Sequence, residues 1–207
     1  MRRMRPVAVA VTTLLLSAAT AGAVTGLEPE PTPPPLGPPL IHQDPVGDVA
    51  GGSGPDFVAC GVSEPWESLV SFTFEFAAEP PLSYDLETWS TDELFVAVSP
   101  RADADFLKGD FEYALIVHGA TLPSDAETGS GLYDSTRAEG DEVYWRVVDI
   151  AVDGSTLTLS VDKKLIGDPD TVYFMAGASR EGQEETEVYD VCPDEEVGPL
   201  AYELVGG

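Results

Sequence analysis

Alternation of apolar and polar residues at every second position is the feature that most limits what this chain can fold into. In the segment SLVSFTFEFAA, Val70, Phe72, Phe74 and Phe76 fall on one side and polar side chains on the other. This period of two is typical of a β-strand with one buried face. The same alternation recurs in residues 92–99, 111–119, 141–152, 155–162 and 171–179. The folded part of the chain is therefore expected to consist of strands.

Turn-forming residues separate nearly all of these segments. Asp153-Gly154 lies between two alternating segments and predicts a tight hairpin. A helical period is almost absent, apart from one short turn at DKKLIG. Many short strands with turns between them predict an all-β fold, an antiparallel β-sandwich of about 8–10 strands. No internal repeat indicates a solenoid or a propeller.

The N-terminus has the composition of an export signal. Basic residues at positions 2, 3 and 5 precede an uncharged, mostly apolar run, which ends at Ala21-Gly22-Ala23. Small residues at this place are typical of a signal-peptide cleavage site. We interpret residues 1–23 as a signal peptide cut after Ala23, with Ala21 as the second choice. The alternative is a membrane anchor, for which the apolar run is short.

Two regions follow the predicted signal peptide. Residues 24–43 are dominated by proline, lack a hydrophobic period, and are predicted to form an extended linker. Residues 44–207 are predicted to form one domain. Since no later stretch has the length and hydrophobicity of a membrane span, we expect a secreted, extracellular protein without membrane insertion after cleavage.

The chain is strongly acidic, with a formal net charge of −27. Loss of the arginines in the signal peptide would make the mature protein more negative still. Such a surface repels phosphate groups, so nucleic acids and anionic membranes are not expected as partners. It attracts divalent cations, but it is equally expected of a protein adapted to high salt. Composition leaves both explanations open.

The chain has two cysteines, Cys60 and Cys192, and they lie far apart. In an oxidising compartment this arrangement predicts one structural disulfide. Two free thiols or a pair of metal ligands are the alternatives.

Several segments, taken in order, resemble a known family. They are DPVGDVAGGSGPDFVACGVS, ELFVAVSPRADADFLKGDFEYALIVHG, DGSTLTLSVDKKLIGDPDTVYFMAG and YDVCPD. Together they are similar to secreted DOMON-like domains, which include the family-nine carbohydrate-binding modules, over residues 44–194. The resemblance implies a jelly-roll-type sandwich without catalysis. It also implies structural calcium near the paired ends of the domain. The opening and closing motifs of the family match Asp44, Gly47, Asp48, Asp56, Asp190, Pro193 and Asp194.

The opening segment DPVGDVAGGSGPD has chemistry that suits calcium. Calcium takes six to eight oxygen ligands in flexible geometry, and a glycine-rich loop allows backbone carbonyls to turn inward. Asp44, Asp48 and Asp56 are therefore candidate ligands of one ion. A Cys60–Cys192 bond would bring Asp190 and Asp194 beside them. The alternative is that these aspartates cap turns through hydrogen bonds to the backbone.

A second acidic loop, DADFLKGD, contains Asp103, Asp105 and Asp110. It is a second candidate metal site, although it lacks the glycine and glutamate spacing of an EF-hand. In the related domains the acidic hairpin lies earlier, so the resemblance does not assign this loop a role.

Tryptophans are the candidate ligand-binding residues, because sugars stack on indole faces. Trp66 and Trp89 lie next to turn signals and are candidate binding platforms, whereas Trp145 alternates with valines and is expected in the core. Carbohydrate binding is thus implied by the resemblance, with these residues as its candidates.

Catalytic motifs are not evident. His42 falls in the predicted linker, His118 ends an alternating strand, and the nucleophile-elbow, zinc-protease and phosphate-loop patterns are absent. We therefore predict a non-catalytic module that binds carbohydrate or another cell-surface ligand. A protein–protein interaction domain is the first alternative, and an unrecognised hydrolase is the second.

Overall fold

The computed structural model describes residues 36–49, 55–78, 84–85, 90–118, 130–137, 145–146, 148–181 and 186–205. The predicted signal peptide, most of the predicted linker and Trp89 lie outside these ranges, as does the side chain of Trp145. The described residues contain no helix with the length and hydrophobicity that a bilayer span needs.

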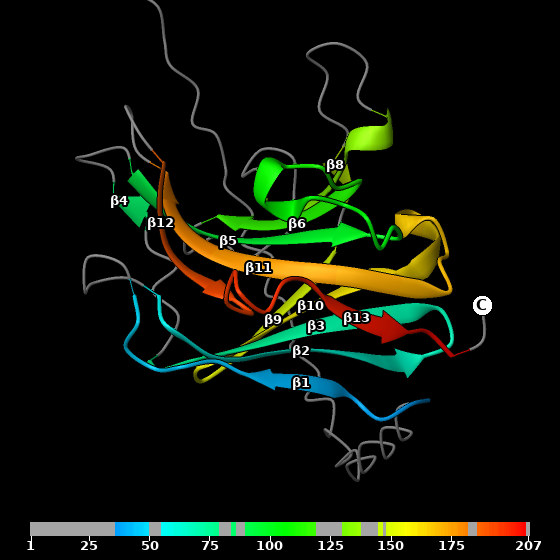
Figure 1. Ribbon diagram of the computed structural model, residues 1–207, viewed down its shortest axis with the longest axis horizontal. Coiled ribbons are helices and arrows are strands. Elements are labelled where there is room, and N and C mark those ends of the chain that lie inside the picture. Colours follow the sequence, from blue (N-terminus) through cyan, green and yellow to red (C-terminus); the bar gives the residue numbers. More distant parts are fainter. Residues whose placement is uncertain are drawn as a thin grey trace, which may run out of the picture. The chain divides into compact units, whose positions relative to one another are not determined.

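Two antiparallel sheets pack face to face, which confirms the predicted all-β sandwich (Figure 1). The first sheet has the order β1-β2-β3-β10-β9. Its strands are β1 (Leu40–Gln43), β2 (Phe57–Trp66), β3 (Leu69–Phe76), β10 (Thr156–Asp162) and β9 (Asp149–Asp153).

The second sheet has the order β12-β11-β5-β6-β7-β8, with β13 paired to β11 and β4 paired to β5. Its strands are β4 (Tyr84–Asp85), β5 (Ser90–Ser99), β6 (Tyr113–His118), β7 (Gly131–Asp134), β8 (Trp145–Arg146), β11 (Thr171–Glu181), β12 (Thr186–Cys192) and β13 (Leu200–Glu203). Short 3-10 helices lie between strands at η2 (Phe106–Lys108), η3 (Ser135–Arg137) and η4 (Lys163–Ile166). The described residues thus form more strands than predicted. β1, β4, β7 and β13 are too short to show an alternating pattern, and β2 and β12 were not among the segments predicted from alternation.

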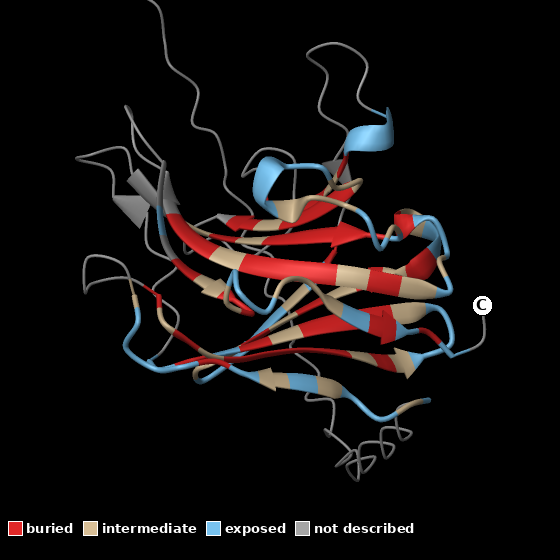
Figure 2. Cartoon of the chain, viewed as in Figure 1, coloured by how far each residue is buried: buried red, intermediate tan, exposed pale blue. Residues whose placement is uncertain are grey.

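The core lies between the sheets and is made by the alternating residues (Figure 2). The inward side chains of β3, including Phe72 and Phe74, are fully buried. Phe72 meets Phe174 of β11 with ring centroids 5.3 Å apart, so the aromatic rings join the two sheets. On the outer face of the first sheet, the hydroxyls of Ser71 and Ser160 are 2.7 Å apart. The inward and outward faces predicted from the sequence are confirmed for this strand.

The predicted hairpin at Asp153-Gly154 is also confirmed. Asp153 of β9 pairs with Thr156 of β10, and Gly154 adopts a φ of 59° in the turn between them. This left-handed conformation is easily adopted by glycine, which is why Asp-Gly favours such turns.

The folded domain begins earlier than the predicted boundary at Asp44. Residues 40–43, assigned to the linker on sequence, form β1 and pair with β2, so His42 lies in a strand. The strand is short and flanked by prolines, which are tolerated at a sheet edge because a backbone donor is not needed there. A Cβ on Gly61 of β2 would lie 2.6 Å from the main-chain oxygen of Leu40. Glycine at this position therefore lets β1 approach closely.

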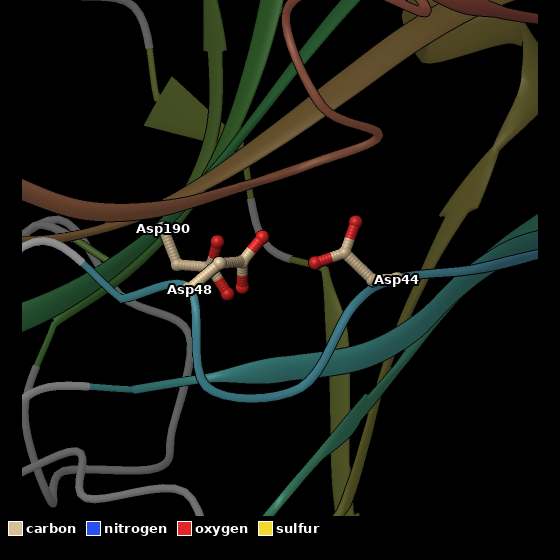
Figure 3. Close-up of side chains that lie close together, drawn as sticks. All are labelled: Asp44, Asp48 and Asp190. Atoms are coloured by element: carbon tan, nitrogen blue, oxygen red, sulfur yellow. The ribbon is translucent and has the colours of Figure 1, made fainter.

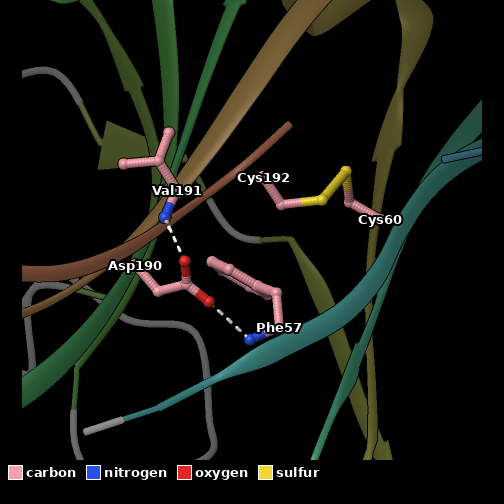
Figure 4. The surroundings of a disulfide bond; sticks show 5 residues. All are labelled: Phe57, Cys60, Asp190, Val191 and Cys192. Carbon is pink, nitrogen blue, oxygen red and sulfur yellow. Dashed lines mark hydrogen bonds between the residues drawn. A yellow bond between two sulfur atoms is a disulfide. The ribbon is translucent and has the colours of Figure 1, made fainter. Parts of the chain in front are cut away.

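The predicted disulfide between Cys60 and Cys192 is present, and it links β2 of the first sheet to β12 of the second. The two Cα atoms are 6.1 Å apart and both side chains are buried (Figure 4). This bond brings the acidic segment before β2 next to the acidic segment at the end of β12, as the spacing of the cysteines suggested.

A buried ion pair lies at the other end of β2. Glu64 and Lys163 are almost completely inaccessible to solvent and contact each other. The main chain of Val205 is bound by both side chains, because its N–H donates to Glu64 and its carbonyl accepts from the Lys163 ammonium at 3.3 Å. The pair therefore fastens the segment after β13 to the sandwich. The sequence did not indicate this contact.

Candidate metal centre

Three aspartates from distant parts of the chain converge at one end of the sandwich (Figure 3). Asp44 directly follows β1, Asp48 lies in the loop after it, and Asp190 belongs to β12. One carboxylate oxygen from each residue lies within 4.8 Å of the others. We call these three residues the acidic cluster.

Asp44 is the most unusual member of the acidic cluster. The residue is only 6% exposed, and neither of its carboxylate oxygens has a hydrogen-bond partner within the described ranges. Burial and, to a smaller extent, the negative charges of Asp190, Asp194, Asp48 and Asp56 together raise the pKa of Asp44 from 3.8 to about 7. A buried carboxylate without a partner is costly, so its position calls for a group that would neutralise it.

Asp190 is oriented by the backbone. Its carboxylate accepts hydrogen bonds from the N–H of Phe57 at 2.6 Å and from the N–H of Val191 at 2.8 Å (Figure 4). Burial raises the pKa of Asp190 to about 6, although these two hydrogen bonds act in the opposite direction. The hydrogen bond from Phe57 joins β2 to β12. The Asp190 carboxylate is therefore part of the acidic cluster and also a link between the two sheets.

The other two candidate ligands near this end have different roles. Both carboxylate oxygens of Asp56 accept from the N–H of Gly47, at 3.1 and 3.0 Å, which holds the loop together. Gly47 has a φ of 90°, a conformation that glycine adopts without strain. The backbone carbonyl of Asp194 accepts from Val197 at 2.9 Å in a turn. Of the five residues proposed on sequence, three thus converge, and the other two contribute negative charge close by.

The second predicted acidic loop is held by ion pairs. The Arg101 side chain contacts Glu112, lies 2.6 Å from the Asp110 carboxylate, and lies 3.8 Å from the Asp103 carboxylate. Lys108 forms a further pair with Asp105 at 2.6 Å, and this hydrogen bond lowers the pKa of Asp105. The three candidate carboxylates are therefore directed to cations of the chain and do not form a common oxygen cluster. Arg101 is the residue that the sequence analysis missed in this loop.

The candidate ligand-binding tryptophans are only partly described. Trp66 lies at the end of β2 and is 41% exposed. A groove of about 270 Å³ runs along the outer face of the first sheet. Its lining includes small residues of β2, such as Ala59 and Gly61, together with Ile41 of β1 and Glu75 of β3. The sequence analysis did not identify this groove, because it depends on the position of β1.

The acidic cluster offers oxygen ligands alone. Carboxylate oxygens suit calcium and magnesium, whereas zinc sites in proteins usually include nitrogen or sulfur. The residues present fit a hard cation, because Asp44 brings two buried oxygens that have no hydrogen-bond partner in the part of the chain that the structure describes. Asp48 is exposed, which leaves room for water as a further ligand.

No protein-family model matches the chain, and no curated protein matches it. The function is therefore inferred from the geometry of the acidic cluster.

Proposed function

We propose that this protein is an exported, non-catalytic binding module whose sandwich is stabilised by calcium. The single observation that carries the proposal is the buried Asp44 carboxylate, which faces Asp48 and Asp190 without a hydrogen-bond partner in the described part of the chain. A bound cation would neutralise Asp44 and reverse the repulsion among the three carboxylates. The disulfide between Cys60 and Cys192 supports export, because such bonds persist in oxidising compartments.

Calcium is preferred over magnesium for a physical reason. Calcium accepts irregular sets of oxygen ligands, whereas magnesium requires near-ideal octahedral geometry and keeps most of its water. The acidic cluster combines a residue just after a strand (Asp44), a loop residue (Asp48) and a strand residue whose carboxylate already accepts two backbone hydrogen bonds (Asp190), and such a set is irregular. We expect a dissociation constant of about 10⁻⁴–10⁻³ M, the range of extracellular calcium modules.

The ligand of the module is proposed to be a carbohydrate or another cell-surface molecule, as the resemblance to DOMON-like domains implies. The strong negative charge argues against nucleic acids and anionic lipids as partners. A protein partner on the cell exterior is the alternative class. The two classes are distinguished by whether the purified domain is retained by neutral polysaccharides.

Thermal melting of the mature protein tests the calcium proposal. Calcium at about 100 times the dissociation constant adds about 2.7 kcal/mol to the free energy of unfolding. For a domain of this size, that corresponds to a rise of about 5–10 °C in melting temperature over the value in chelator. Sodium chloride at matched ionic strength controls for general screening of an acidic protein, and tests adaptation to salt at the same time.

Two variants separate the acidic cluster from acidic residues in general. Asp48→Asn removes one proposed ligand and should abolish most of the rise caused by calcium. Asp103→Asn removes an equal charge from an exposed side chain of the second acidic loop and should leave the rise unchanged. The proposal fails if calcium has no effect beyond that of sodium chloride, or if the two variants respond alike.

A further inference from the structure

Strand β1 is weakly attached to the rest of the sandwich. It is an edge strand whose only paired neighbour in the described sheet is β2, over the four residues Leu40–Gln43. Its side chains are exposed or half-buried, and Ile41 is 61% exposed. Only Leu40 of this strand packs against the hydrophobic core, and it does so partially. Apolar burial therefore contributes little to holding β1 in place.

The buried anchor of this segment is a charged residue. Among residues 36–49, the only buried side chain is that of Asp44, at the end of β1. The Asp44 N–H donates to the carbonyl of Val58 at 2.9 Å, and this bond extends the pairing with β2 by one residue. Docking of β1 thus carries the Asp44 carboxylate to a position beside Asp48 and Asp190. The free-energy cost of burying this carboxylate therefore falls on a strand that has little apolar burial to offset it.

The surrounding structure does not depend on this docking. The Cys60–Cys192 bond and the hydrogen bond from Phe57 to Asp190 hold β2 to β12 independently of β1. β2 is also paired along its length with β3. The far end of the N-terminal segment is fastened separately, because the N–H of Leu36 donates to the carbonyl of Glu64 at 3.0 Å. Release of β1 would therefore be local, an opening of the kind that weakly attached elements undergo below global unfolding.

We propose that a cation bound at the acidic cluster acts as a latch for β1, docking this strand on β2 when bound and releasing it when removed. With the cation, Asp44 is attracted to the position that it must occupy when β1 is docked. Without the cation, the carboxylates repel one another there. The inference rests on the proposed calcium site and adds to it a defined conformational consequence.

The latch would also control the groove on the outer face of the first sheet. Pro39, Leu40 and Ile41 contribute one side of this groove, next to the small residues of β2. Release of β1 removes that side and exposes the backbone edge of β2. Any molecule that binds in the groove would then bind in a calcium-dependent manner.

Hydrogen exchange measured by mass spectrometry on the whole mature protein tests the latch. The protein is compared in calcium and in chelator at about pH 8, where the raised pKa values leave the carboxylates charged. Peptides that cover residues 36–48 should exchange about tenfold faster or more in chelator, because the amides of β1 lose their partners. Peptides from β3 and β10 should change much less. Equal changes in all strands, or no change in residues 36–48, would overturn the latch.

Asp44→Asn separates the latch from a general effect of calcium. Asparagine keeps the size of the side chain but removes the charge that opposes docking. Residues 36–48 of this variant should stay protected in chelator and should not respond to calcium. Asp103→Asn is the matched control and should behave as the wild type. If Asp44→Asn exchanges as fast as the wild type in chelator, repulsion does not release β1 and the latch is wrong.

The two proposals fail in different ways. A calcium-dependent rise in melting temperature without a change in β1 exchange would leave the calcium site standing and remove the latch. An absence of any calcium effect, in melting or in exchange, would remove both.

Discussion

The two raised pKa values of the acidic cluster predict an unusual dependence of stability on pH. Some carboxyl groups have a higher pKa in the folded than in the unfolded protein. At a pH between these two pKa values, such a group binds more protons in the folded protein. The pKa of Asp44 rises from 3.8 to about 7 and that of Asp190 from 3.8 to about 6. Without calcium, the contribution of these two groups to the free energy of unfolding should therefore be most favourable below about pH 4. This contribution should be lost as the pH rises to about 7.

The magnitude follows from the size of the shifts. One pKa unit corresponds to about 1.4 kcal/mol, so the shift of Asp44 alone is worth up to about 4 kcal/mol. The shift of Asp190 is worth up to about 3 kcal/mol by the same conversion. The combined effect is not a simple sum of independent groups, because the charge of Asp190 is one cause of the raised pKa of Asp44. Local release of β1 would reduce it further.

Urea denaturation in chelator, at a series of pH values from about 4 to about 8, measures this effect. Asp44→Asn is the essential comparison, because the general repulsion of an acidic chain also grows with pH and is nearly equal in both proteins. The difference between variant and wild type should grow with pH, up to about 4 kcal/mol in favour of the variant. In calcium the order should reverse, since the variant lacks a ligand. A difference that does not change with pH in chelator would show that the Asp44 charge does not cause the loss of stability.

Three further changes test other contacts, with urea denaturation in calcium as the measurement. Lys163→Met should cost about 3–5 kcal/mol, because it leaves the buried Glu64 carboxylate unpaired; adding Glu64→Gln should recover part of the loss, and an additive loss would contradict this explanation. Gly61→Ala should cost about 1–3 kcal/mol and expose β1 to hydrogen exchange, since its Cβ meets a main-chain oxygen at 2.6 Å; unchanged exchange would be inconsistent with the close approach. Replacing Cys60 and Cys192 by serine should cost about 2–5 kcal/mol, and a smaller loss would show that other contacts already join β2 to β12.

The strands and their buried faces were predictable because they depend on neighbours in the sequence. The alternation around Phe72 and Phe74 places one face inward whatever the sheet order is. The turn at Asp153-Gly154 is likewise local. The disulfide was predictable for a different reason, since a chain with two cysteines allows a single intramolecular pairing.

The candidate site was predictable as a region but not as a set of ligands. The sequence placed five aspartates near the two cysteines, and the structure brings three of them together. Asp56 differs because its side chain reaches the N–H of Gly47 and holds the loop. The second acidic loop did not form a cluster because Arg101 and Lys108 reach its carboxylates. Such choices depend on side-chain positions, which periodicity does not describe.

The amino-acid sequence was enough to predict the class of fold, the inward face of the strands that show a clear alternating pattern, and the covalent link between the sheets. Three features emerge only in the folded protein: β1 belongs to the domain, Glu64 and Lys163 meet in the interior, and Asp44 is buried without a hydrogen-bond partner among the described residues. The physical reason is the range of the interactions. Hydrophobic alternation and turn chemistry act between residues close in sequence, whereas the burial of a charge depends on which distant segments the sandwich brings beside it.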